Sequence, residues 1–181
     1  MILALLLAVA AQGPVVNVST SMGDFKVRLN PKAAPASVAN FLTYVREKHF
    51  DGTVFHRVIK KFMIQGGGFD ADLKKAGSTH APIKNESQNG LKNKTGTIAM
   101  ARTADPDSAT DQFYINVNDN AFLDSRGGAP GYAVFGEVTA GLAVVKKIEA
   151  VETAGRPSAD GQALSDVPVK PVIIRSIRVA K

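Results

Sequence analysis

Apolar residues recur at two spacings along the chain, and the two spacings predict different elements. Apolar residues at every second position predict eight short strands, which cover 15–18, 25–29, 54–59, 62–66, 97–101, 112–117, 133–138 and 172–179. Spacing of three and four residues predicts two amphipathic helices, 37–48 and 140–151. Polar stretches at 69–95, at 102–111 and around 155–161 are predicted as loops. Many short strands with two helices and no repeat predict an all-β-dominated fold, a closed antiparallel barrel with helical caps.

The third and fourth strands form the most informative stretch, a hairpin whose turn is Lys60-Lys61. A period of two sorts its side chains into shared faces: Phe55, Arg57 and Ile59 on the first strand, Met63 and Gln65 on the second. A guanidinium among aromatic and thioether side chains needs partners or a ligand once it leaves water. The alternative is that Arg57 extends its charge outward from an ordinary barrel strand.

The strand 112–117 alternates in the same way and offers a second mixed face. Its two faces are Phe113, Ile115 and Val117 on one side, and Gln112, Tyr114 and Asn116 on the other. The face that carries Gln112 and Tyr114 is a candidate for binding, although core packing is the better explanation of any one aromatic residue taken alone.

Composition bounds the protein class. A chain of 181 residues with 45% apolar and 21% charged residues predicts one globular domain. The net charge is +6 and the pI is about 9.6. The lysines are spread along the chain without interleaved aromatic residues, which favours a solvated basic surface over nucleic-acid binding. Cysteine is absent, so disulfides and thiolate metal sites are excluded.

The N-terminus carries an apolar run from Ile2 that ends in Ala8-Val9-Ala10. It is typical of a signal peptide cleaved before Ala11, and it is too short to span a bilayer. No Lys or Arg lies between Met1 and the run, so a start assigned too far downstream, or a buried N-terminal segment, is the alternative. We expect residues 1–10 to be a signal peptide or its remnant and 11–181 to be one domain of an exported, periplasmic protein, with the cytoplasm as the alternative location.

Other chemistries find little support. The three histidines do not stand at metal-ligand spacing, and no Gly-x-Ser-x-Gly elbow exists. His56 alternates away from Arg57 and is predicted to be a packed or satisfied histidine, not a base. Gly66 to Gly68 end a strand without the Lys-Ser/Thr of a phosphate loop. We therefore expect neither a metal nor a cofactor.

The amino-acid sequence of the hairpin resembles the signature of the cyclophilin family of peptidyl-prolyl cis-trans isomerases. The matching segments are Phe55 to Ile59 and Phe62 to Gly67, followed in family order by Gly96 to Ala101, Asp111 to Asn116, Phe122 to Asp124 and Tyr132 to Gly136. The resemblance covers roughly residues 15 to 180 and implies an eight-stranded barrel capped by two helices. It implies catalysis of rotation about X-Pro bonds to assist protein folding, and unfolded or loop segments that contain proline as clients.

The resemblance also implies roles for individual residues. Arg57 would be the catalytic donor that stabilises the twisted transition state. The substrate-binding set would be Phe62, Met63, Tyr114 and Leu123 around the proline ring, Gln65 and Gln112 near backbone or water, Ala101 and Arg102 along the edge, and Phe122 and Tyr132 at the rim. A monomer is expected.

Four departures from the family pattern stand out: Lys60-Lys61 in place of Pro-Gly, Tyr114 for Phe, Arg102 for Asn, and Phe122 with Tyr132 where Trp and His are common. Loss of the indole N–H at position 122 predicts weak cyclosporin binding. The rival interpretation is a non-catalytic chaperone, or holdase, that binds proline-containing chains in the same groove. Arg57 separates the two, because a pure binder has no use for a donor that acts only in the transition state.

Overall fold

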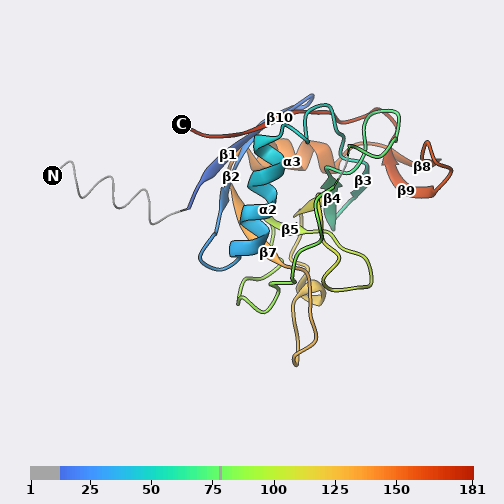
Figure 1. The fold of residues 1–181 in the computed structure, drawn as a ribbon. Helices are drawn as coiled ribbons and strands as arrows, with labels where there is room; N and C mark the ends of the chain where they lie inside the picture. Colours follow the sequence, from blue (N-terminus) through green and yellow to red (C-terminus); the bar gives the residue numbers. More distant parts are fainter. Residues whose placement is uncertain (1–12, 78) are drawn as a thin grey trace.

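One curled, eight-stranded antiparallel sheet organises the chain in a computed structural model that describes residues 13–77 and 79–181 (Figure 1). The elements are β1 (Val15–Thr20), β2 (Gly23–Leu29), α2 (Pro35–Arg46), β3 (Arg57–Ile59), β4 (Met63–Gly66), β5 (Thr97–Met100), β6 (Phe113–Asn116), the 3-10 turn η1 (Ala121–Leu123), β7 (Val134–Ala140), α3 (Leu142–Glu149), β8 (Thr153–Pro157), β9 (Ala163–Pro168) and β10 (Ile174–Val179). The sheet runs in the order β10, β1, β2, β7, β5, β6, β4, β3.

The sheet is an open half-barrel, so the prediction of a closed barrel was wrong. Strands β3 and β10 are its two edges, and they are not paired as a ladder. A single bridge, Val54 to Ile173, joins the segments that precede these strands. Strand β3 has only three residues, which leaves it too short to continue that pairing into a closed sheet.

The central strands are buried on both faces, and this feature positions the site. Adjacent residues divide between two hydrophobic clusters. The inner cluster takes Ile64, Ile98, Ile115 and Phe135. The outer cluster takes their neighbours Met63, Ala99, Tyr114 and Val134. Because side chains alternate across a strand, the core and the outer cluster are the two sides of β4, β5, β6 and β7.

Helix α2 covers part of the inner cluster through Val38, Phe41 and Val45. Its first turn has no side-chain cap from Ala34. Glu86 takes that place from a distant loop, accepting hydrogen bonds from the backbone N–H groups of Ala36 at 2.9 Å and Ser37 at 2.8 Å. A carboxylate there satisfies helix donors and complements the positive end of the helix dipole.

Helix α3 holds the turn of the β3–β4 hairpin. The backbone N–H of Lys61, which lies in the left-handed region at φ 59°, donates to Glu149 Oε1 at 2.7 Å. This hydrogen bond and the pull of Lys146 lower the pKa of Glu149 against the opposing effect of burial. The two-lysine turn predicted from the sequence is therefore present and is tied to α3.

Two further predictions were wrong. The stretch around 155–161, expected as a loop, forms the hairpin β8–β9, whose side chains are mostly exposed and so give no apolar alternation. Phe55 does not share a face with Arg57, because β3 begins only at Arg57. Phe55 is fully buried in the inner cluster instead.

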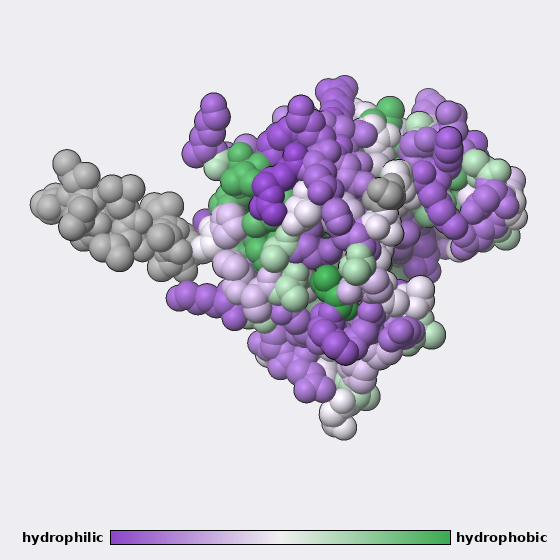
Figure 2. Space-filling view, in the orientation of Figure 1, coloured by the Kyte–Doolittle hydropathy of each residue, from purple (hydrophilic) through white to green (hydrophobic). Residues whose placement is uncertain are grey.

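The surface is mainly polar. Figure 2 shows one face as mostly hydrophilic with small hydrophobic groups. Within residues 13–77 and 79–181, no helix combines the length and apolar character needed to cross a bilayer. The expected signal peptide lies outside the described residues.

Candidate functional site

A pocket of about 160 Å³ opens over the outer cluster. It is lined by nine of the eleven residues singled out from the sequence: Arg57, Phe62, Met63, Gln65, Ala101, Arg102, Tyr114, Leu123 and Tyr132. They come from β3, β4 and the turn that joins them, from β6, from η1 and from the loops that follow β5 and precede β7. The fold thus brings most of the predicted set together, while the role of each residue stays a prediction.

Strand register explains why the polar members meet. Arg57 pairs with Gln65, Gln65 with Tyr114, and Tyr114 with Ala99 across four neighbouring strands. Side chains opposite one another in an antiparallel pair lie about 5 Å apart at Cβ. The guanidinium, the amide and the phenol therefore lie in one row, and Ala99 adds little bulk to the row.

Arg57 is half-buried, and its side chain makes none of the hydrogen bonds or ion pairs found among the described residues. Among the described residues, the pocket lining contains two cations, Arg57 and Arg102, and no carboxylate. The donors of Arg57 are consequently available to a ligand.

The two glutamines connect this pocket to a second one. Gln65 Nε2 donates to Gln112 Oε1 at 2.9 Å. Gln112 lines the neighbouring pocket, also about 160 Å³, together with Gln65, Ala101 and Arg102. The two glutamines thus contact each other, but Gln112 lines the neighbouring pocket and not the main one.

The apolar wall is formed by Met63, 2% exposed, and by the Tyr114 and Phe62 rings. Phe122, at 66% exposure, does not line the pocket. It stacks on Phe62 with ring centroids 5.6 Å apart. Phe122 therefore reaches the pocket only through Phe62, and its place at the rim stays a prediction.

The hydroxyl of Tyr114 does not project freely into the pocket. It donates to Asn93 Oδ1 at 2.7 Å, and Asn93 Oδ1 also accepts from Asn116 at 3.2 Å. Burial raises the pKa of Tyr114 above its ordinary value. The extra hydroxyl is thus neutral and used in the structure, which leaves the ring to face the pocket.

Arg102 ties two walls of the groove together. Its guanidinium lies 4.4 Å from the centroid of the Tyr132 ring. It donates to the carbonyl oxygens of Gly131 and Pro130 on one side, both at 3.2 Å, and to that of Thr103 at 2.9 Å on the other. Such a planar fork holds several acceptors at fixed angles, which a lysine cannot do.

His56 lies behind Arg57 and is 4% exposed. Burial lowers its pKa to about 4, and its ring packs 4.7 Å from that of Phe69. The predicted packing is confirmed, but its Nδ1 has no hydrogen-bond partner among the described residues. A neutral ring at pH 7 suits a packing residue.

Comparison with known proteins decides the family. The profile described as cyclophilin type peptidyl-prolyl cis-trans isomerase/CLD matches residues 15–179. The chain belongs to the cyclophilin family.

Curated relatives that are covered over nearly their whole length support the activity. Peptidyl-prolyl cis-trans isomerase cyp18 of Streptomyces antibioticus is 54% identical over 167 residues, 91% of this chain and 97% of that protein. Peptidyl-prolyl cis-trans isomerase B of Escherichia coli is 49% identical over 170 residues, 92% and 100% of the two chains. This cyclophilin is a peptidyl-prolyl cis-trans isomerase of the bacterial type.

A solved structure supports the fold. The crystal structure of a cyclophilin-type isomerase from Cryptosporidium parvum, determined in the presence of the dipeptide Ala-Pro, superposes with a TM-score of 0.74 at 24% identity. The match covers 92% of this chain and 99% of that one.

Sequence reasoning missed the residues of the cyclophilin pocket that support it from behind. Asn93, 1% exposed, lies in a polar stretch that was expected to be loop and gives no sign of burial. Ala99 and Val134 belong to the outer cluster but were assigned only to strands. Alternation against Ile98 and Phe135 could have placed both on the pocket side.

Proposed function

We propose that Arg57 is the catalytic residue of this isomerase and donates to the prolyl nitrogen as the X-Pro bond twists. Resonance gives the C–N bond partial double-bond character and a barrier of ~18 to 20 kcal/mol. In the twisted state the nitrogen becomes pyramidal and regains a lone pair that accepts a hydrogen bond. A donor that finds its acceptor only then lowers the barrier without tightening the ground state.

The observation that carries this proposal is the free guanidinium. Arg57 lines an apolar pocket without a carboxylate and without an internal partner among the described residues. An increase in rate from about 10⁻² to 10³ per second would require roughly 7 kcal/mol. One charge-assisted hydrogen bond, together with desolvation of the pocket by the substrate and positioning by the surrounding walls, can supply a contribution of that size.

The remaining pocket residues would hold the substrate. Phe62, Met63, Tyr114 and Leu123 would surround the proline ring, and Gln65 with Gln112 would contact its backbone or bound water. Ala101 and Arg102 would bind the backbone of the substrate residue that precedes proline, and Phe122 and Tyr132 would lie at the rim. The Ala-Pro dipeptide named with the Cryptosporidium parvum structure supports proline-containing peptides as ligands.

The test is NMR exchange spectroscopy of an Ala-Pro peptide with the unmodified protein and its Arg57→Ala variant. We expect the variant to lose ten-fold or more of the exchange rate while it still binds the peptide, which corresponds to at least ~1.4 kcal/mol of transition-state stabilisation. Arg46→Ala, at an exposed position in the last turn of α2, removes the same charge and should leave the rate unchanged.

Two results would count against this role. If Arg57→Ala binds the peptide and keeps its full exchange rate, another group supplies the stabilisation. If the unmodified protein binds the peptide without accelerating exchange, the groove holds proline-containing chains as a clamp.

We also propose that clients are unfolded or loop segments of other proteins, that the protein acts as a monomer, and that it is exported to the periplasm. Sedimentation velocity tests the monomer. Mass spectrometry of the protein from its own cells tests cleavage before Ala11, and an intact apolar run would contradict export by this route.

Cyclosporin should bind weakly, because Phe122 offers no indole N–H. Its exposure of 66% leaves the ring little contact area beyond Phe62. A dissociation constant below 100 nM by calorimetry, on the order of −10 kcal/mol, would contradict this expectation.

A further inference from the structure

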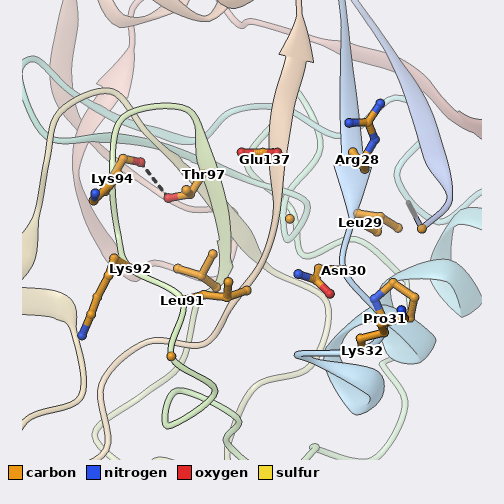
Figure 3. A pocket seen from close by; sticks show the side chains of 14 residues that line it. Arg28, Leu29, Asn30, Pro31, Lys32, Leu91, Lys92, Lys94, Thr97 and Glu137 are labelled. Carbon is orange, nitrogen blue, oxygen red and sulfur yellow. Dashed lines mark hydrogen bonds between the residues drawn. The ribbon is translucent and has the colours of Figure 1, made fainter. Parts of the chain in front are cut away.

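A further hollow, distinct from the proline pocket and from the pocket lined by Gln112, is larger than either, at about 490 Å³. It opens over β2, β7 and the loop before β5. Its lining carries four cations and one carboxylate: Arg28, Lys32, Lys92 and Lys94 against Glu137. Figure 3 shows Lys92 and Lys94 on one side of this hollow, Arg28 and Lys32 on the other, and Glu137 between them.

The floor of the hollow is set by the sheet. Gly136 of β7 lies between Leu29 of β2 and Ile98 of β5. A Cβ atom at Gly136 would come within 2.4 Å of the Arg28 carbonyl oxygen. Only glycine permits this approach, so the strand that separates the cations has no side chain at this point.

Two hydrogen-bond donors at the hollow lack acceptors among the described residues. Asn30 Oδ1 accepts from the backbone N–H of Ala33 at 3.1 Å, which fixes the amide. Figure 3 shows the amide nitrogen of Asn30 on the side that faces the hollow. The Nε of Arg28 is shielded from water and likewise has no partner. Buried donors normally find acceptors, so the Nε of Arg28 is available to an oxygen atom of a ligand. Asn30 is only half-buried, and its amide nitrogen is a second donor at the same hollow.

The outer cluster connects the hollow to the proline pocket. Leu91 and Val134 line the hollow and also belong to this cluster, together with Met63 and Tyr114, which line the proline pocket. A chain bound in the proline pocket could therefore extend over the outer cluster toward the cations. Among residues 13–77 and 79–181, no aromatic residue lines the hollow, so these residues offer no stacking surface for bases.

We infer that this hollow, lined by Asn30 and the four cations, binds a carboxylate-bearing segment of the client polypeptide and selects clients with acidic residues near the X-Pro bond. The inference deepens the proposed function and rests on it. An Asp or Glu side chain would accept from Asn30 Nδ2, while the lysines supply charge-assisted contacts.

The experiment compares four peptides that share one Ala-Pro unit and differ in flanks: neutral, three Glu before the unit, three Glu after it, and three Lys after it. Affinities are measured by calorimetry at 50 mM salt with the full chain. We expect at least one Glu-bearing peptide to bind ten-fold or more tightly than the neutral peptide. Equal affinities for all four would overturn the inference.

Two variants with the same change in net charge distinguish binding at this hollow from non-specific attraction by the basic surface of the protein. Asn30→Asp keeps an oxygen for the Ala33 N–H but replaces the donor by a negative oxygen. Lys26→Gln removes a charge from an exposed position of the same strand that does not line the hollow. We expect Asn30→Asp to abolish most of the ten-fold gain and Lys26→Gln to change it less than two-fold. Equal losses in the two variants would overturn the site.

Competition distinguishes the sources of negative charge. Inorganic phosphate at 10 mM should not displace the Glu-bearing peptide, and a twenty-residue oligothymidylate should bind more weakly than that peptide. Displacement by phosphate, or tighter binding of the oligonucleotide, would overturn the assignment to a polypeptide. Exchange of the neutral peptide reports the proposed function independently, since neither variant touches the proline pocket. If this exchange is catalysed but the Glu flanks do not change affinity, the inference about the hollow is refuted and the proposed function is not.

Discussion

The hydrogen bond between Tyr114 and Asn93 allows a sharp test of the claim that this hydroxyl serves the fold and not the reaction. Tyr114→Phe removes the hydroxyl but keeps the ring. Asn93 Oδ1 then still accepts from Asn116. The loss should be that of one neutral hydrogen bond, about 1 kcal/mol of unfolding free energy.

Asn93→Ala should cost more, about 3 kcal/mol. It leaves the Tyr114 hydroxyl, in a side chain 4% exposed, without its acceptor, and an unsatisfied buried group costs more than the bond itself contributes. It also deletes the side-chain hydrogen bond to Asp124 Oδ1 at 3.1 Å. The double variant has no tyrosine hydroxyl that lacks an acceptor. Its loss of unfolding free energy should therefore be about 2 kcal/mol smaller than the sum of the losses in the two single variants.

Urea unfolding measures these losses, and each kcal/mol should lower Tm by about 2 to 4 °C in a chain of this length. The exchange rate of Tyr114→Phe should stay within two-fold of that of the unmodified protein. A double variant whose loss equals the sum would refute the coupling. A ten-fold slower exchange at unchanged stability would show that the hydroxyl contacts the substrate.

Three further substitutions test other parts of the structure. Glu86→Ala should lower the unfolding free energy by about 2 kcal/mol in urea melts, because it uncaps α2, and should leave exchange unchanged. His56 has a folded pKa of about 4, below the unfolded value of 6.5, so the unfolded chain binds the proton first. The contribution of His56 to the free energy of unfolding is fully present above pH 6.5 and decreases by roughly 3 kcal/mol as the pH falls to about 4. Urea unfolding of His56→Gln at a series of pH values should lack this part of the decrease. Arg102→Lys should raise KM several-fold with little change in kcat, since an ammonium cannot donate to the carbonyl oxygens of Gly131 and Thr103 together. An unchanged KM would show that substrate binding does not depend on these hydrogen bonds.

Alternation along single strands allowed the sequence to predict much of the site. It placed Gln112 with Tyr114 and Met63 with Gln65, and the structure has these pairs on the outer face or beside it. It failed for Phe55, where the backbone leaves the strand before Arg57 and the period of two no longer holds. The spacing of apolar residues does not show at which residue the pairing between two strands begins or ends.

The other errors have a common cause, which is that they depend on contacts between distant segments. Whether the sheet closes is decided by the pairing of β3 with β10, from opposite halves of the chain. The acceptor for Tyr114 comes from Asn93 in a loop without apolar pattern. The cap of α2 comes from Glu86, which resembles any surface carboxylate in the sequence. Local spacing does not encode such partners.

Burial of β4, β5, β6 and β7 on both faces has a consequence for how this protein tolerates insertions and deletions. A one-residue slip in β6 would exchange Tyr114 with Ile115 and place a hydroxyl in the core, and it would put an isoleucine opposite Gln65. The same slip thus destroys folding and catalysis together. We therefore expect a one-residue insertion to be tolerated in the mostly exposed β8–β9 hairpin and to prevent folding in any of these four strands.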